Sequence, residues 1–410
     1  MDSVIETPIS RALKQAASSV ITKVGPSSVP PYISFAIENE TGLKAGTHFA
    51  ASTMDGTDAT KTGANDALAA CARCFSTFQE AYATSAQMAC GSVSADMASV
   101  TKAMSTTTML IRLVSESQIN LDDPARKFLP SYSGLEKSRV TLRMLLRHRA
   151  GSYECQPFFC ASTSREETLL LAQQAPLRYA PDTKESYSDI DFILLGAIIE
   201  RVTGMRLDQA FSELVARPLH LRHTTYAHPS TRTECLPSAF DDSVEISRID
   251  NTAEPVCPTV IDTPLTPPLY HHMVRGVVHD ANTRFSLDGI SGHAGLFSTL
   301  EDMIIWGMAL SDYTEHANLW NPKVCESFFT TGPDNDQALG FWAMKLQVGN
   351  MEYPLMWHPG FTGTSIGFIP GQHTAFALIT NRLMVSGPHC ITNTMFKATL
   401  SSMGYEPVPQ

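Results

Sequence analysis

The sequence has no long apolar run and no excess of basic residues. No segment approaches the ~20 consecutive apolar residues that a membrane-spanning helix needs. The 30 lysines and arginines are outnumbered by 41 aspartates and glutamates, which gives a formal net charge of -11. Nucleic acids and anionic membrane surfaces repel a chain of this charge. These absences argue against nucleic-acid and membrane partners and favour a small-molecule or short-peptide substrate.

A disulfide or zinc framework is also missing. The nine cysteines are an odd number and are scattered. The one close pair, Cys71 and Cys74, has no second pair that would complete a zinc knuckle. Residues 1–7 show neither the basic start nor the apolar stretch of a secretion signal. We therefore expect reduced thiols and a cytoplasmic location, with export after removal of a leader as the alternative; the sequence does not indicate an oligomeric state.

The chain is long enough for a large core and two domains, with 410 residues of which 43% are hydrophobic. Apolar spacings of three and four predict an opening amphipathic helix from Ile5 to Val24. Further helices are expected at Ser99–Glu116, Thr141–Arg147, Arg165–Gln174, Asp189–Thr203, Leu300–Leu310 and Cys390–Ser402. Strands are expected at Tyr32–Ile37, Thr47–Ala51, Phe341–Gln347, Gly363–Ile369 and Thr374–Thr380. The proline-rich segment from Leu207 to Val274 is interpreted as loops and short strands.

This order of elements predicts an α/β (α+β) fold in which an antiparallel sheet is flanked by helices. Residues 1–98 and 275–410 would form the sheet-and-helix domain, and residues 99–274 an inserted, mainly helical domain. The segment 52–91 is rich in alanine, threonine and serine and is interpreted as an insertion with one helix near Asp66–Tyr82. Clefts commonly form between domains, so the site is expected there.

Ser99 and Lys102 are the first candidate catalytic pair. At a spacing of three, the two side chains lie on the same helical face, so the lysine nitrogen can reach the serine oxygen. An amine can take the serine proton only when the amine is itself neutral, which requires lowering the lysine pKa by roughly 3 units, about 4 kcal/mol. Burial beside another donor is one way to achieve this. The alternative is an ordinary helix start, with Ser99 near the cap and Lys102 reaching solvent.

Two later motifs favour the catalytic interpretation, Tyr187-Ser188-Asp189 and His358-Pro359-Gly360. Together with Ser99-Val-Thr-Lys102, and in this order, they resemble the active-site serine family of penicillin-binding proteins, class C beta-lactamases and family VIII esterases. The flanking stretches 96–102, 121–130 and 141–151 resemble the same family. The resemblance covers most of the chain and implies a beta-lactamase/transpeptidase-like fold.

The resemblance implies a role for each matching residue. Ser99 would be the nucleophile, and Lys102 and Tyr187 would carry its proton, with either of them as the base. An adjacent ammonium would favour the phenolate form of Tyr187; the alternative is a packing tyrosine before a helix. The backbone N–H groups of Ser99 and Phe361 would form the oxyanion hole. Gly360 would let the substrate lie close to the strand.

Asp189 and His358 depart from the beta-lactamase pattern and would contact substrate or its surroundings. Asp189 replaces an asparagine; it would either hold Lys102 charged or cap a helix beginning at Ile190. His358 replaces a lysine and would supply a weaker, pH-dependent positive charge for a substrate carboxylate.

Metal chemistry is the weaker interpretation of the remaining polar residues. The candidate donors are His271, His272, His279, His293 and Asp280. Their spacing matches no regular ligand motif, and the family needs no metal for acyl transfer, so we expect no metal and no cofactor. Loop-bracing roles are expected for His279, Asp280 and Asn282. Gln156 is expected on a surface loop, with a hydrogen bond to a substrate amide as the alternative.

The resulting hypothesis is a serine hydrolase that acts through an acyl-enzyme on a small ester or amide. Candidate substrates include D-amino-acid peptides of the cell-wall type and, secondarily, beta-lactams. The alternatives are an acyltransferase with the same acyl-enzyme and a non-catalytic member that binds peptides or partners.

Overall fold

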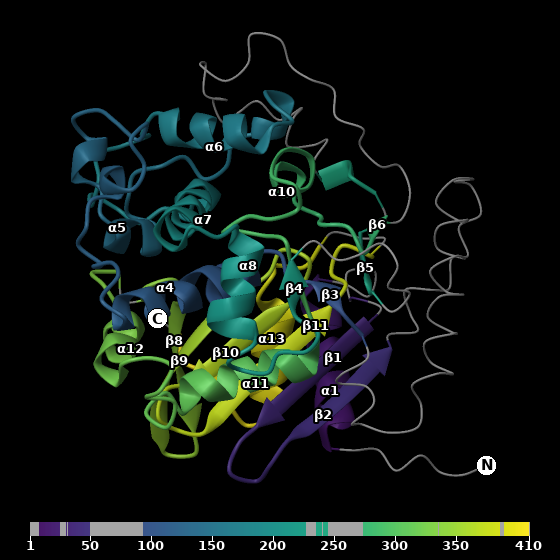
Figure 1. The fold of residues 1–410 in the computed structure, drawn as a ribbon. Helices are drawn as coiled ribbons and strands as arrows, with labels where there is room; N and C mark the ends of the chain where they lie inside the picture. Colours follow the sequence, from purple (N-terminus) through teal and green to yellow (C-terminus); the bar gives the residue numbers. More distant parts are fainter. Residues whose placement is uncertain are drawn as a thin grey trace, which may run out of the picture.

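A seven-stranded antiparallel sheet forms the centre of the structure (Figure 1), which is a computed structural model. The described residues are 8–24, 30, 32–49, 93–226, 235–239, 241–244, 274–334, 336–385 and 389–409. The strand order is β12-β8-β9-β10-β11-β1-β2. In chain order the strands are β1 Tyr32–Glu38, β2 Lys44–Phe49, β8 Trp342–Val348, β9 Met351–Pro359, β10 Ser365–Ile369, β11 Thr374–Thr380 and β12 Glu406–Pro407.

Both faces of this sheet are covered by helices. Every residue of β10 and β11 is buried, as expected for central strands with apolar side chains on both faces. Along β1, Phe35 and Ile37 pack into the cluster that includes helices α1 (Pro8–Val24) and α13 (Thr394–Ser402). Ala36 faces the opposite way, into the larger cluster with α11 (Leu300–Ser311). The sheet therefore lies between α1 and α13 on one face and α11 on the other.

A second group of helices lies beyond one end of the sheet, where Figure 1 shows α5, α6 and α7 together. Their bounds are α5 Leu142–Leu146, α6 Arg165–Gln174 and α7 Asp189–Thr203. Helix α7 begins after Ser188, whose Oγ accepts the N–H of Asp191, and ends at Gly204 in the left-handed region. Other helices are η3 Lys102–Thr107, α4 Thr108–Ser115, α8 Leu207–Phe211, η7 Ser212–Ala216, α10 Ala281–Ser286 and α12 Pro322–Phe329.

Two small sheets complete the strand pairing. The first has the order β3-β7-β4, with β3 Ala95–Asp96, β7 Leu296–Ser298 and β4 Thr225–Tyr226. The second pairs β5 Pro237–Ala239 with β6 Val274–Arg275. The three-stranded sheet matters for function because β3 leads directly into Ser99.

The predicted fold class is confirmed, as are the helices at 165–174 and 189–203. The helix predicted at Ser99–Glu116 is also confirmed, although Lys102–Thr107 forms a π-helix before α4 begins. The loop interpretation from Leu207 is wrong for its first part, since α8 and η7 occupy residues 207–216. Ile5 and the predicted insertion helix at 66–82 lie outside the described residues. The division into domains stays a prediction.

Helices long and apolar enough to cross a bilayer are absent from the described part of the chain.

Candidate active site

Ser99 follows a strained turn between β3 and the first helical turn. Ala98 has a φ of 45°, a left-handed conformation that non-glycine residues rarely adopt. Its backbone N–H donates to Asp96 Oδ1 at 2.8 Å. The side chain of Ser99 is half-buried, so its hydroxyl is positioned by the protein and remains within reach of solvent.

Lys102 is fully buried directly beside Ser99. Its Nζ donates to Ser99 Oγ at 3.0 Å, to Asp189 Oδ1 at 2.7 Å and to the carbonyl oxygen of His293 at 3.3 Å. Burial is the largest single influence and lowers the lysine pKa, but the interactions with Asp189 and Tyr187 together raise it by more, and the net pKa lies above its usual value. The route to a neutral Lys102 that was expected from burial beside another donor is therefore not found, because the lysine is paired with the carboxylate of Asp189.

Tyr187 lies against the same ammonium, with Lys102 Nζ 4.8 Å from the ring centroid. Burial raises the phenol pKa, while the interactions with Lys102 and Ser99 act in the opposite direction; the net pKa is raised. The expected preference for phenolate is thus not found. The ring of His148 lies 4.6 Å from that of Tyr187, centroid to centroid, and Trp342 stacks at 6.3 Å.

Asp189 is the ionic partner of Lys102 and not the cap of α7. The cap is Ser188, whereas Asp189 is the first helical residue and has a partly exposed side chain. Of the two roles expected from the sequence, the structure therefore favours the one in which a carboxylate holds Lys102 charged.

His358 is buried near the end of β9, with 2% of its surface exposed. Its Nδ1–H donates to the carbonyl of Pro359 at 2.8 Å. Burial, together with the positive charge of Lys102, lowers the histidine pKa to about 3. The expectation of a pH-dependent positive charge at His358 is therefore wrong for the neutral range, in which the imidazole is uncharged.

The turn after β9 packs against the backbone that precedes Ser99. Thr362 Oγ1 donates to the carbonyl of Asp96 at 2.7 Å, and Thr364 Oγ1 donates to that of Met97 at 3.0 Å. A Cβ added at Gly360 would overlap Thr364 Oγ1 and lie 2.5 Å from the Met97 oxygen. Gly360 is therefore required by contacts within the protein, and its role in letting the substrate lie close to the strand stays a prediction. These contacts also hold the adjoining Phe361 next to the serine turn.

The polar residues around His293 form an internal network. Asp189, Asp280 and His293 each bring one ligand-type atom within 4.8 Å of the others. However, Lys102 donates to Asp189, and the imidazole Nε2–H of His293 donates to Asp280 Oδ1 at 3.0 Å. Burial raises the Asp280 pKa, but the interactions with His293 and Thr283 outweigh it, and the net pKa is lowered. Lys102 and His293 thus already hydrogen-bond to these two carboxylates, and we assign no metal to them.

Two further sequence expectations can be compared with the structure. The backbone N–H of His279 donates to Asp96 Oδ2 at 2.7 Å, and Asn282 Nδ2 donates to the carbonyl of Gln156 at 2.8 Å. Both contacts agree with the expected bracing of loops. The surface position expected for Gln156 is wrong, since its side chain is 2% exposed. His271 and His272 lie outside the described residues.

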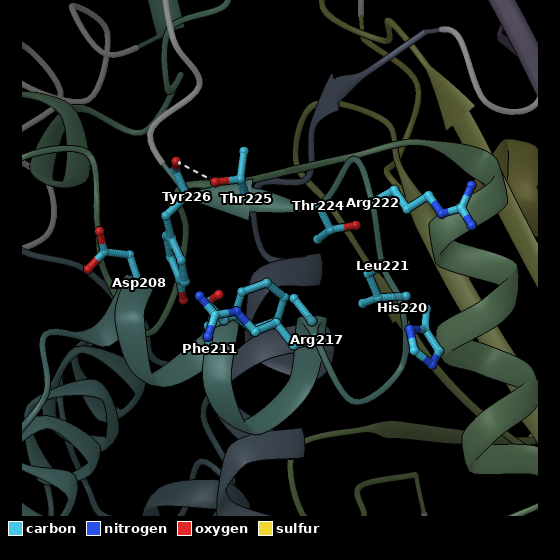
Figure 2. A pocket seen from close by; sticks show the side chains of 11 residues that line it. Asp208, Phe211, Arg217, His220, Leu221, Arg222, Thr224, Thr225 and Tyr226 are labelled. Atoms are coloured by element: carbon cyan, nitrogen blue, oxygen red, sulfur yellow. Dashed lines mark hydrogen bonds between the residues drawn. The ribbon is translucent and has the colours of Figure 1, made fainter.

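A surface cavity of about 440 Å³ lies apart from these residues, between α8, η7 and β4. Figure 2 shows Asp208 at one end of it and His220 and Arg222 at the other. None of the residues discussed above lines this cavity. The groups suited to acyl transfer are gathered at Ser99 instead.

Sequence reasoning missed three residues of the site. Asp96 stands inside a stretch that resembles the family and the sequence offers His293 only as a candidate metal donor, but the hydrogen bonds in the fold show their contacts with the Ser99 turn and with Lys102. His148 contacts Tyr187 from a different helix end, and its Nδ1 accepts the N–H of Ser188 at 3.1 Å. No local sequence signal relates these positions.

The antiparallel sheet with helices on both faces, and the serine, lysine and tyrosine brought together at its end, place the chain among the serine hydrolases. The family model described as Beta-lactamase matches residues 94–394. The chain belongs to the beta-lactamase family.

Relatives and solved structures agree with this assignment. The chain is 29% identical over 311 residues to an Escherichia coli K12 protein named "Putative D-alanyl-D-alanine carboxypeptidase", covering 70% of this chain and 68% of that protein. A Salmonella typhimurium protein with the same name is 28% identical over 335 residues, 76% of this chain and 74% of the other. Among solved structures, a D-stereospecific amidohydrolase from Streptomyces sp. has a TM-score of 0.61 at 18% identity, with 95% and 98% of the two chains covered. The hydrolase EstCE1 has a TM-score of 0.61 at 16% identity, with 97% and 100% covered.

Proposed function

We propose that Ser99 is the nucleophile of this hydrolase and that its substrate is a small ester or amide. The observation that carries the proposal is the 3.0 Å contact between Lys102 Nζ and Ser99 Oγ at a half-buried, solvent-reachable position. Ser99 Oγ attacks the carbonyl carbon, the leaving group departs with a proton, and water then hydrolyses the ester on Ser99.

The serine proton passes to Lys102 or Tyr187. Because the pKa values of both groups are raised, both are largely protonated at neutral pH. The reactive form is the minor one in which one of the two has lost its proton, and the proton that it takes from Ser99 is then delivered to the leaving group. Acylation should therefore become faster as pH rises above neutrality.

The backbone N–H groups of Ser99 and Phe361 are proposed to bind the negative charge that develops on the substrate oxygen. The hydroxyls of Thr362 and Thr364 support this role, because they fix the Phe361 turn against residues 96 and 97. Donors fixed before reaction stabilise the transition state without reorganisation.

The proposed substrate class includes peptides and amides of D-amino acids. The names of the E. coli and Salmonella relatives support it. The uncharged His358 supports substrates in which no free carboxylate must be bound at that position. Transfer of the acyl group to an amine or alcohol, in place of water, is the second candidate outcome of the same intermediate.

Labelling of Ser99 tests the nucleophile. The protein is incubated with a fluorophosphonate or a penicillin and its intact mass is measured. We expect one adduct, lost in Ser99→Ala and retained in Ser138→Ala, which removes an exposed serine hydroxyl. Absence of any adduct between pH 6 and 10 would contradict the proposal and favour a binding function.

A panel of substrates tests the substrate class. Aryl esters, D-amino-acid amides and peptides ending in D-alanyl-D-alanine are compared, each with and without an added amine acceptor. Hydrolysis of esters and amides without a free carboxylate should be fastest. Product appearing mainly on the added amine would support acyl transfer instead.

A cytoplasmic location is proposed with export as the alternative. The free thiols of four described cysteines support it, namely Cys160, Cys235, Cys325 and Cys390. Cell fractionation with an antibody to the chain tests this proposal.

A further inference from the structure

The carboxylate of Asp96 connects the segments that meet at Ser99. Its Oδ1 accepts the N–H of Ala98 at 2.8 Å, and its Oδ2 accepts the N–H of His279 at 2.7 Å. Its own carbonyl accepts the Thr362 hydroxyl at 2.7 Å. The side chain is buried, with 2% of its surface exposed. One residue thus joins the turn before Ser99, the loop before α10 and the turn after β9.

We propose that Asp96 is a positioning residue for Ser99, whose ionised carboxylate holds the serine turn in its reactive geometry by accepting two backbone N–H groups at once. This inference rests on the proposed role of Ser99 as nucleophile. The three hydrogen bonds of Asp96 involve neither Ser99 nor Lys102, so its proposed effect on the serine is indirect.

The left-handed backbone conformation of Ala98 explains why the turn needs the Asp96 carboxylate. A non-glycine residue at φ 45° persists only when its surroundings hold it there. The bond from the Ala98 N–H to Asp96 is such a restraint, and it lies one residue before the nucleophile. If the turn relaxes, Ser99 Oγ moves relative to Lys102 Nζ, and a displacement of about 1 Å can slow a reaction on the order of 100-fold.

Both carboxylate oxygens must accept, so an amide or a protonated acid cannot replace the carboxylate. The side chain of asparagine has one acceptor and one donor, and the donor would face an N–H. Protonation of Asp96 likewise places a hydrogen atom on a carboxyl oxygen, where it would face a backbone N–H group. Acid should therefore disturb the Ser99 turn without any change in Lys102 or Tyr187.

The charges around Asp96 set the pH at which this occurs. Burial and the nearby Asp280 raise its pKa, and the bonds from His279 and Ala98 and the charge of Arg284 lower it; the net pKa is raised to about 6. The Cys235 thiol also faces Asp96. The Asp96 carboxylate is thus ionised at pH 7 and protonated below about pH 6.

The test measures the rate at which Ser99 reacts with a fluorophosphonate in Asp96→Asn, between pH 4.5 and 9. We expect the reaction to be about 10–100-fold slower at pH 8. We also expect the acid limb near pH 6 in the wild type to disappear. The matched control is Asp302→Asn, since the buried Asp302 also accepts two backbone N–H groups, those of Arg222 and His223, away from Ser99. This control should retain the acid limb.

Hydrogen exchange of residues 96–101 gives a second readout that needs no reaction. After correction for the intrinsic effect of pH, exchange in the wild-type protein should rise as pH falls from 7 to 5. Thr362→Val should slow the labelling of Ser99 less than Asp96→Asn does. An Asp96→Asn protein with the wild-type rate, acid limb and exchange would overturn the inference. A wild-type protein that is never labelled would instead overturn the proposed nucleophile, and unchanged exchange across this pH range would then overturn the role of Asp96 as well.

Discussion

Lys102 is a buried cation whose charge is supported by a neighbouring carboxylate. Burial alone would lower its pKa, and the ion pair with Asp189 at 2.7 Å, together with the interaction with Tyr187, reverses that effect. Asp189→Asn removes the partner's charge and leaves a group of the same shape. The pKa of Lys102 should then fall, and the alkaline rise in labelling of Ser99 should move to lower pH by the same amount.

The pH profile of labelling from pH 6 to 10.5 measures this shift. Asp122→Asn is the matched control, because Asp122 pairs with Arg143 at 2.8 Å on the exposed surface. An unshifted profile in Asp189→Asn would mean that the alkaline limb does not report the titration of Lys102.

His358 couples the stability of the fold to pH. Its pKa falls from the ordinary 6.5 to about 3 on folding, because the buried imidazole is held neutral. A lowered pKa contributes stability that is present above pH 6.5 and lost as pH falls toward 3, on the order of 5 kcal/mol in total. His358→Asn should therefore reduce the slope of unfolding free energy against pH in that window.

Urea unfolding at several pH values between 3.5 and 7 measures the slope. His148, whose pKa is also lowered, leaves a residual slope in the variant. His220→Asn, which changes an exposed histidine, is the control and should keep the wild-type slope. Equal slopes in all three proteins would show that His358 titrates normally.

At the scale of elements, helix α7 and the loop that carries His293 make a close backbone contact. A Cβ added at Gly292 would overlap the carbonyl of Phe192 and lie 2.9 Å from the N–H nitrogen of Gly196. Main-chain atoms cannot rotate aside, so Gly292→Ala must push α7 away from the loop. We expect a loss of about 2–3 kcal/mol in unfolding free energy and slower labelling of Ser99.

Chemical unfolding and labelling rates check this prediction together. Gly349→Ala provides the comparison: it sits at φ 58° in the turn before β9 and would meet no atom within 4 Å. It should cost about 1 kcal/mol through backbone strain and leave labelling unchanged. A smaller loss in Gly292→Ala than in Gly349→Ala would contradict the close contact.

Elements with local signals could be predicted from the sequence, whereas those that depend on packing could not. Helix α7 was predictable because a serine cap and a terminal glycine enclose one apolar run. The signal for α12 was present but unused: Asn321 caps it and Pro322 is its first residue. The π-helix at 102–107 was not predictable, because all six residues are buried and no exposed face marks the period.

The same distinction holds within the site. The positions of Ser99, Lys102, Tyr187 and Asp189 followed from motifs, since each motif is short and local. Their charges did not follow, because the pKa of Lys102 depends on how closely Asp189 approaches it from another helix. The neutral state of His358 likewise depends on burial, which the sequence around it does not specify.

At the scale of the whole molecule, the two ends of the chain build one layer. Leu13 of α1 is completely buried in the cluster that also contains Phe396 and Leu400 of α13. Leu13→Ala should cost about 2–5 kcal/mol, because it leaves a cavity between these helices and the sheet. Gln15→Ala, on the exposed side of α1, should change stability little.

Thermal or urea unfolding measures the difference between the two variants. Loosening in Leu13→Ala should extend to α13, which hydrogen exchange can detect in residues 394–402. Protection of α13 that is unchanged in Leu13→Ala would show that the two terminal helices are not coupled.

The pairing of β1 with β11 also constrains how the molecule is made. Phe35 lies opposite Leu378 in this ladder, so β1 has no neighbour on that side until the distant β11 has also been translated. During that interval its apolar side chains and unpaired backbone groups are available to other nascent polypeptides. Slow translation or high expression temperature should therefore favour inclusion bodies, and coexpressed chaperones should raise the yield.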